Sequence, residues 1–189
     1  EGLSSFVGLD PIPLVHGLTV GELAKMINGE GWLAGNKSCD LTIIPVKNYD
    51  HNTKYSLPVA PSPNLPNDVS IRLYPSLCLF EATVMSIGRG TDFPFQVVGY
   101  PDSTYGNFEF TPVSIPGKST HPKLEDQKCY GVDLRNTSLD HQFTLKYIID
   151  FYKKAGNHPK YIDRSQVFNR LAGNTTLQQQ LKDGLSEEE

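Results

Sequence analysis

The sequence lacks the features that mark membrane, disulfide-rich, metal-binding and nucleic-acid-binding proteins. No apolar run approaches the roughly 20 residues that a membrane-spanning helix needs. A net charge of -4 provides no basic field to attract nucleic acid or anionic lipid, and the five histidines show no metal-ligand spacing. We therefore expect no metal, no other cofactor, no nucleic-acid partner and no membrane span.

Cysteine is also scarce. The three cysteines, Cys39, Cys78 and Cys129, are too few and too scattered for a disulfide framework, and the odd count leaves at least one free thiol. Cys78 and Cys129 lie in apolar runs, which favours small core hydrophobes for all three, with a thiol nucleophile as the alternative.

The composition is ordinary for a soluble globular protein, with 38% hydrophobic and 20% charged residues. A length of 189 residues suits one domain, and we expect residues 1–189 to form it. The chain opens on Glu1 and closes on Ser186 followed by three glutamates, a pattern typical of a helix start. We expect the protein to continue beyond both ends.

Helix signals stand at both ends of the chain. Thr19 and Glu22 form a capping-box pattern, and the helix that it starts is expected to end near Asn28-Gly29. Apolar residues from 143 to 152 repeat at helical spacing before Gly156. Two shorter amphipathic helices are expected within residues 163–173 and 174–184, each after a capping Asp or Asn and each ending at Gly.

The middle of the chain indicates strands. Apolar, β-branched or alternating runs predict strands at 41–46, 76–85, 94–100, 108–113 and 129–136. The proline-rich stretch 57–66 must be a loop. Strands first and helices later predict an α+β fold with a mixed, largely antiparallel sheet, flanking helices and a helical C-terminal part.

A carboxylate and an arginine interrupt this pattern. The strand predicted at 76–85 is apolar on both faces, so Glu81 needs a partner or a raised pKa, which suits either a general acid or a structural ion pair. In Gly88-Arg89-Gly90-Thr91 the glycines permit positive φ and close ligand approach, and the guanidinium offers a fork for a carboxylate or phosphate. A tight hairpin turn with an exposed arginine explains the motif equally well.

Two more polar residues are candidates for a binding role. Asn64 lies in the stiff proline-rich loop, which either braces the fold or lines a cleft. His16 precedes Gly17 and either lines a site or bonds the backbone that enters the first helix.

Four blocks of sequence together resemble one enzyme family. In order, SSFVGLDPIPLVHGLTVGELAKMIN, PSPNLP, LYPSLCLFEATVMSIGRGTDFPFQVVGYP and CYGVDLRN resemble the second half of the NamZ-type exo-β-N-acetylmuramidases, a bacterial family formerly known as a domain of unknown function. The resemblance covers roughly residues 1 to 185.

The resemblance implies a glycoside hydrolase that removes terminal N-acetylmuramic acid from peptidoglycan fragments during cell wall recycling. It also implies a Rossmann-like N-terminal domain, absent from this chain, that forms the active-site cleft together with the part present here. The matching positions are Glu81 as the catalytic group and Arg89, Gly90, Thr91, Asn64 and His16 as substrate-binding residues. The sequence departs from the family pattern by having Ala82, Val84 and Ile87 where Gly, Asn and Glu are frequent.

Two other functions remain open. A non-catalytic carbohydrate-binding domain would use exposed aromatic residues such as Trp32, Tyr49 and Tyr105, and a structural domain would only stabilise its neighbour. Glycoside hydrolysis normally needs two carboxyl groups, and Asp92 and Asp102 lie nearby in sequence, although nothing in the sequence shows that they face Glu81. We expect the second group on the absent domain, an inactive isolated chain, and a periplasmic or secreted protein whose leader is not in this chain.

Overall fold

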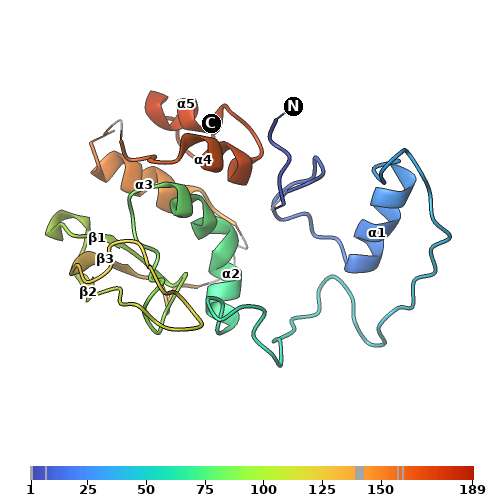
Figure 1. Ribbon diagram of the computed structural model, residues 1–189, viewed down its shortest axis with the longest axis horizontal. Coiled ribbons are helices and arrows are strands. Elements are labelled where there is room, and N and C mark those ends of the chain that lie inside the picture. The colour runs from blue at the N-terminus through green and yellow to red at the C-terminus, as the bar shows by residue number, and fades with distance from the viewer. Residues whose placement is uncertain (1, 7, 139–142, 157, 159) are drawn as a thin grey trace. The chain divides into compact units, whose positions relative to one another are not determined.

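The computed structural model describes residues 2–6, 8–138, 143–156, 158 and 160–189 (Figure 1). The chain forms two compact units, whereas the sequence analysis treated residues 1–189 as one domain. The larger unit comprises Glu1–Leu9 and Leu57–Glu189, and the smaller unit comprises Asp10–Ser56. Within the described part of the chain, no helix is both long and apolar enough to cross a membrane.

The smaller unit contains helix α1, Val20–Gly29, where the sequence predicted it. The capping box is complete: the backbone N–H of Glu22 donates to Thr19 Oγ1 at 3.2 Å, and the backbone N–H of Thr19 donates to Glu22 Oε2 at 2.8 Å. These two bonds satisfy donors that the first turn of a helix leaves without partners.

The strand predicted at 41–46 is wrong, because this segment is irregular and Ile44 is 87% exposed. A strand needs a neighbour for its backbone groups, and none of the described residues pairs with this segment. No residue of the range 10–56 is buried. The smaller unit therefore has no hydrophobic core of its own.

The larger unit contains a three-stranded antiparallel sheet. Its strands are β1, Val97–Tyr100, β2, Phe108–Phe110, and β3, Cys129–Asp133, in the order β1-β3-β2. Gly99 of β1 and Phe108 of β2 both lie opposite Gly131 of β3. All three strands lie inside ranges that the sequence predicted as strands.

The strand predicted at 76–85 is also wrong. Residues Asp68–Leu77 form helix α2, which continues into the 3-10 helix η1, Cys78–Ala82. The Asn67 side chain accepts from the Ser70 backbone N–H at 2.9 Å and starts the helix upstream of the apolar run. An apolar run that is buried on all sides fits a core helix as well as a central strand, so alternation alone misled the prediction.

The C-terminal part is helical, as predicted, with α3, Lys146–Lys154, α4, Ser165–Ala172, and α5, Leu177–Asp183. Gly173 and Gly184 adopt left-handed conformations where α4 and α5 end. A second 3-10 helix, η2, spans Ser103–Tyr105. Helices flanking a small antiparallel sheet confirm the predicted α+β class.

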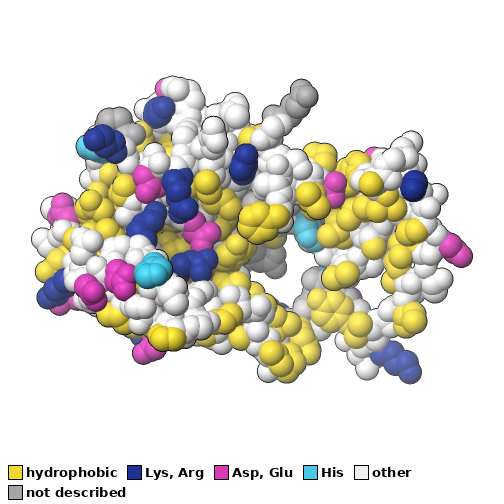
Figure 2. Space-filling model, viewed as in Figure 1, with side chains coloured by type: hydrophobic (Ala, Val, Ile, Leu, Met, Phe, Trp, Pro, Cys, Tyr) yellow, Lys and Arg dark blue, Asp and Glu magenta, His cyan; other side chains and the backbone are white. Residues whose placement is uncertain are grey.

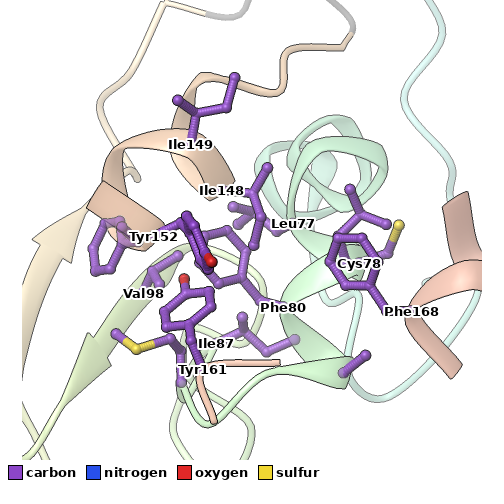
Figure 3. Close-up of a cluster of buried hydrophobic side chains, with 14 of the residues drawn as sticks. Leu77, Cys78, Phe80, Ile87, Val98, Ile148, Ile149, Tyr152, Tyr161 and Phe168 are labelled. Carbon is purple, nitrogen blue, oxygen red and sulfur yellow. The ribbon is translucent and has the colours of Figure 1, made fainter. Parts of the chain in front are cut away.

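The main core lies among α2, η1, α3 and α4, and buried side chains of the sheet region join it (Figure 3). Phe80 and Phe151 meet edge to face with ring centroids 5.7 Å apart. Burial raises the pKa of the Cys78 thiol to about 12 and that of Cys129 to about 11, which makes both poor nucleophiles. The prediction that all three cysteines are core residues is wrong for Cys39, which is exposed.

Candidate active site

Glu81 lies near the end of η1, which packs against α4. The backbone N–H of Val84 donates to the carbonyl of Tyr161 at 2.9 Å. Arg164 Nη2 donates to the Glu81 carbonyl, and Lys123 Nζ lies 3.4 Å from the same oxygen and donates to the Thr83 carbonyl. Two cations therefore hold the backbone that carries Glu81.

The turn Gly88-Arg89-Gly90-Thr91 places the Arg89 side chain next to the Glu81 carboxylate. Gly88 and Gly90 have φ values of +78° and +83°, which L side chains rarely adopt. A Cβ atom at Gly88 would lie 2.7 Å from a Val97 methyl group, and one at Gly90 would lie 2.6 Å from the Val113 carbonyl oxygen. The glycines thus allow this turn to pack closely against the protein itself.

The carboxylate and the guanidinium that the sequence singled out form one ion pair. Glu81 Oε1 accepts from Arg89 Nε at 3.0 Å and also from Arg89 Nη2. The Arg89 guanidinium lies 5.0 Å from the centre of the Phe95 ring, a cation–π contact. The side chains of Glu81 and Arg89 are 25% and 36% exposed, so Glu81 is hydrogen-bonded as predicted but only half-buried.

The pair faces a cavity of about 710 Å³. Glu81 is the one carboxylate among the described residues that line it. Cationic or titratable nitrogen groups come from five residues: Arg89, His121, Lys123, Arg164 and Arg170. Apolar walls come from Phe6, Met85, Ile87, Pro122, Val167 and Leu171. Figure 2 shows Lys and Arg side chains gathered beside apolar surface on the larger unit.

Sequence reasoning did not identify three of these cations, Lys123, Arg164 and Arg170. Lys123 Nζ also lies 3.7 Å from Asp163 Oδ2, and burial lowers the pKa of the Lys123 ammonium. These residues are 34 to 81 positions away from Arg89 in the chain, counted from Lys123 and from Arg170. No local motif connects them, so only the fold brings them together.

Two of the predicted substrate-binding residues support the Arg89 turn without lining the cavity. Thr91 is buried, and its hydroxyl donates to the Gly88 carbonyl at 2.6 Å. Gly90 is packed against Val113 and Pro122. Both residues therefore act on the position of Arg89.

Asn64 is 7% exposed and does not line the cavity. Its Nδ2 donates to the Lys118 carbonyl at 2.8 Å, and Lys118 Nζ donates to the Thr91 carbonyl at 2.8 Å. The sequence left open whether the proline-rich loop braces the fold or lines a cleft. These contacts match the first alternative, because they connect the loop to the segment that follows Arg89.

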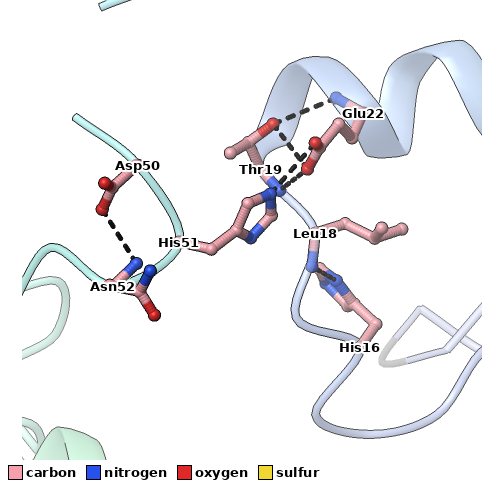
Figure 4. A network of polar contacts seen from close by, with 7 residues as sticks. All are labelled: His16, Leu18, Thr19, Glu22, Asp50, His51 and Asn52. Carbon is pink, nitrogen blue, oxygen red and sulfur yellow. Dashed lines mark hydrogen bonds and ion pairs between the residues drawn. The ribbon is translucent and has the colours of Figure 1, made fainter.

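His16 belongs to the smaller unit (Figure 4). Its Nδ1 accepts from the backbone N–H of Leu18 at 3.0 Å, directly before α1, which matches the structural alternative from the sequence analysis. In the same unit His51 Nε2 lies 3.0 Å from Glu22 Oε1. The Glu22 carboxylate raises the pKa of His51, and hydrogen bonds from Thr19 and His51 lower the pKa of Glu22 to about 2.

The remaining candidates lie elsewhere. Neither Asp92 nor Asp102 lines the cavity, and Asp102 instead accepts from the Thr104 backbone N–H at 2.8 Å. Tyr105 is 8% exposed and stacks on Phe151, so it cannot present a face to a sugar. Within the described ranges no group of three or more His, Cys, Asp or Glu residues could hold a metal ion, and His141 lies outside those ranges.

Comparison with known proteins gives consistent matches along the whole chain. The family described as "Exo-beta-N-acetylmuramidase NamZ, C-terminal" matches residues 72–189, and its N-terminal counterpart matches residues 1–69. The chain is 34% identical over 204 residues to the peptidoglycan beta-N-acetylmuramidase NamZ of Bacillus subtilis (strain 168), covering 98% of this chain and 48% of that protein.

Two solved structures have a similar fold, and both are DUF1343 family proteins from Bacteroides fragilis NCTC 9343. One is 46% identical with a TM-score of 0.92 and covers 98% of this chain and 53% of its own. The other is 21% identical with a TM-score of 0.77, which supports the fold alone. The chain spans about half the length of the relatives that it matches. On the evidence of both profile matches, the chain belongs to the NamZ family of exo-β-N-acetylmuramidases.

Proposed function

We propose that the full-length protein is a glycoside hydrolase that releases terminal N-acetylmuramic acid from peptidoglycan fragments. The observation that carries the proposal is the Glu81–Arg89 pair, which faces a cavity of about 710 Å³ in a member of this family. A cavity of that size is within the usual range for small-molecule sites. Its excess of cations suits an acidic sugar.

In this proposal Glu81 is the catalytic carboxylate and Arg89 fixes its orientation. An ion pair with a guanidinium suits a carboxylate that acts in its charged form, as a base, a nucleophile or an electrostatic stabiliser of the oxocarbenium-like transition state. This differs from the general acid that the sequence suggested, because an acid must hold a proton. The turn that carries Arg89 is held in shape by Gly90, Thr91 and Asn64, which therefore contribute indirectly. A direct role of His16 in substrate binding stays a prediction.

The second catalytic group is proposed to come from outside this chain. Glycosidases ordinarily place two carboxyl groups about 5–9.5 Å apart around the scissile bond, and the described residues that line the cavity supply only Glu81. The chain would then form one wall of a cleft, completed by the rest of the N-terminal domain. Of the aromatic residues that a purely carbohydrate-binding role would use, Tyr105 is buried, Trp32 is half-buried and Tyr49 is exposed, and none of them lines the cavity.

The experiment that tests this function compares two chromogenic substrates, the β-glycosides of N-acetylmuramic acid and of N-acetylglucosamine. The full-length protein should release the chromophore from the first and not from the second, and the isolated 189-residue chain should release neither. No release by the full-length protein would overturn the proposal. Comparable rates for the isolated chain would place both catalytic groups within it.

We also propose that the protein acts in the periplasm or outside the cell, in the recycling of cell wall fragments. This location is supported by the proposed substrate, because peptidoglycan lies outside the cytoplasmic membrane. Fractionation of cells that carry a tagged chromosomal copy should find the protein outside the cytoplasm. Recovery of the tag in the cytoplasmic fraction alone would refute this placement.

A further inference from the structure

The charges around the cavity are strongly unbalanced. Four side chains that are cationic at neutral pH line it, Arg89, Lys123, Arg164 and Arg170, and Glu81 is the one carboxylate among the described lining residues. Grouped charges of one sign attract a ligand of the opposite sign. The ligand that fits this cavity therefore carries negative charge, and one of the cations must be available to bind it.

Three of the four cations are already engaged with the protein. Arg89 holds the Glu81 carboxylate and lies over the Phe95 ring. Lys123 contacts backbone carbonyl oxygens and the Asp163 carboxylate, and Arg164 donates to the Glu81 carbonyl. These contacts hold the three side chains against the segment that carries Glu81, although the Arg89 and Arg164 guanidinium groups keep further N–H donors.

Arg170 differs from the other three. It lies in the last turn of α4 and is exposed, and none of the described residues forms a hydrogen bond or ion pair with its side chain. Val167 and Leu171 line the cavity from the same helix, at positions one turn before Arg170 and directly after it. Val167 lies on the same helix face as Arg170, three residues before it, and so places apolar surface beside the exposed guanidinium.

We propose that Arg170 binds the lactyl carboxylate of N-acetylmuramic acid and so selects the muramic sugar; this assignment rests on the proposed function. The lactyl group distinguishes this sugar from N-acetylglucosamine and consists of a carboxylate and a methyl group on one carbon. A guanidinium can bind a carboxylate through two parallel hydrogen bonds, and Val167 and Leu171 offer apolar contact to the methyl group. Arg89, engaged by Glu81, serves the reacting end of the sugar.

The test compares N-acetylmuramic acid with its methyl ester at the lactyl carboxyl, in which a methyl group replaces the negative charge. Dissociation constants are measured by calorimetry for the full-length wild-type protein and for Arg170→Gln and Arg170→Lys. Arg72→Gln is the matched control, because Arg72 is exposed on α2 and does not line the cavity. Circular dichroism and thermal unfolding check that every variant is folded.

Wild type should bind the acid about tenfold to hundredfold more tightly than the ester, the range expected for a charge-assisted hydrogen-bonded pair. Arg170→Gln should remove this preference and leave the ester affinity unchanged, Arg170→Lys should restore part of it, and Arg72→Gln should match wild type. A preference retained by Arg170→Gln would overturn the assignment while leaving the proposed function in place. Failure of wild type to bind either ligand would overturn the assignment alone, and failure to cleave the muramic glycoside would overturn both the assignment and the proposed function.

Discussion

The substitution Glu81→Gln should change the free energy of unfolding only slightly while it greatly lowers the catalytic rate. The amide keeps the shape of the side chain, and its oxygen can still accept from Arg89, but it loses the negative charge that strengthens the bonds from Nε and Nη2. For a pair whose side chains are 25% and 36% exposed, we expect a loss of about 1 kcal/mol in the free energy of unfolding. In a chain of 189 residues that lowers Tm by about 2–4 °C, and in the longer full-length protein by less.

The effect on activity should be far larger. A carboxylate that takes part in proton transfer contributes roughly 100- to 10,000-fold to the rate, so kcat on the muramic glycoside should fall by that factor. Glu109→Gln is the matched control, because it removes the same charge from a surface ion pair with Lys128 at 2.7 Å and lies outside the cavity. Steady-state kinetics and thermal unfolding of the full-length variants provide the data. Full activity in Glu81→Gln, or equal losses in both variants, would show that Glu81 has no catalytic role.

Three further predictions concern the ion pair and the smaller unit. Arg89→Lys keeps the charge but loses the planar fork that orients Glu81, so kcat should fall roughly tenfold to hundredfold with little change in KM; an unchanged kcat would count against this. NMR titration should give His51 a pKa above 6.5 that returns towards 6.5 in Glu22→Gln. The pKa of Glu22 is lowered and that of His51 is raised, so the pair stabilises the unit fully between about pH 4.5 and 6.5. This stabilisation decreases as the pH falls towards 2, where Glu22 takes up a proton, and as the pH rises through the pKa of His51, where His51 loses one. An unshifted pKa of His51 would contradict the pairing. Hydrogen exchange in the isolated chain should be fast in α1 and slow in α2, because no residue of the smaller unit is buried; strong protection of α1 would disprove that reading.

The sequence predicted elements best where local chemistry decides them. The Thr19–Glu22 capping box and the left-handed glycines after α4 and α5 depend on near neighbours in the chain. The three strands lie inside ranges that local apolar patterns predicted, but the pairing of β1 and β2 with β3 is non-local. The run 76–85 and the segment 41–46 were misassigned because both are apolar and short. For such runs, tertiary packing decides between helix, strand and irregular structure.

The candidate site was only half predictable. Glu81 and Arg89 stood out because charged residues in an apolar run need partners, and in the structure each is the other's partner. The cations that complete the cavity, Lys123, Arg164 and Arg170, are ordinary surface residues in the sequence. Packing of α4 against η1 brings two of them to the cavity, and nothing in their local sequence indicates it.

The central claim is that the cavity beside Glu81 holds the muramic sugar. A crystal structure of the full-length protein with bound N-acetylmuramic acid tests this most directly. We expect the sugar in this cavity, with its anomeric carbon towards the Glu81–Arg89 pair and its lactyl carboxylate within hydrogen-bond distance of the Arg170 guanidinium. A sugar bound elsewhere on the protein, with no ligand density beside Glu81, would show that this cavity is not the muramic site.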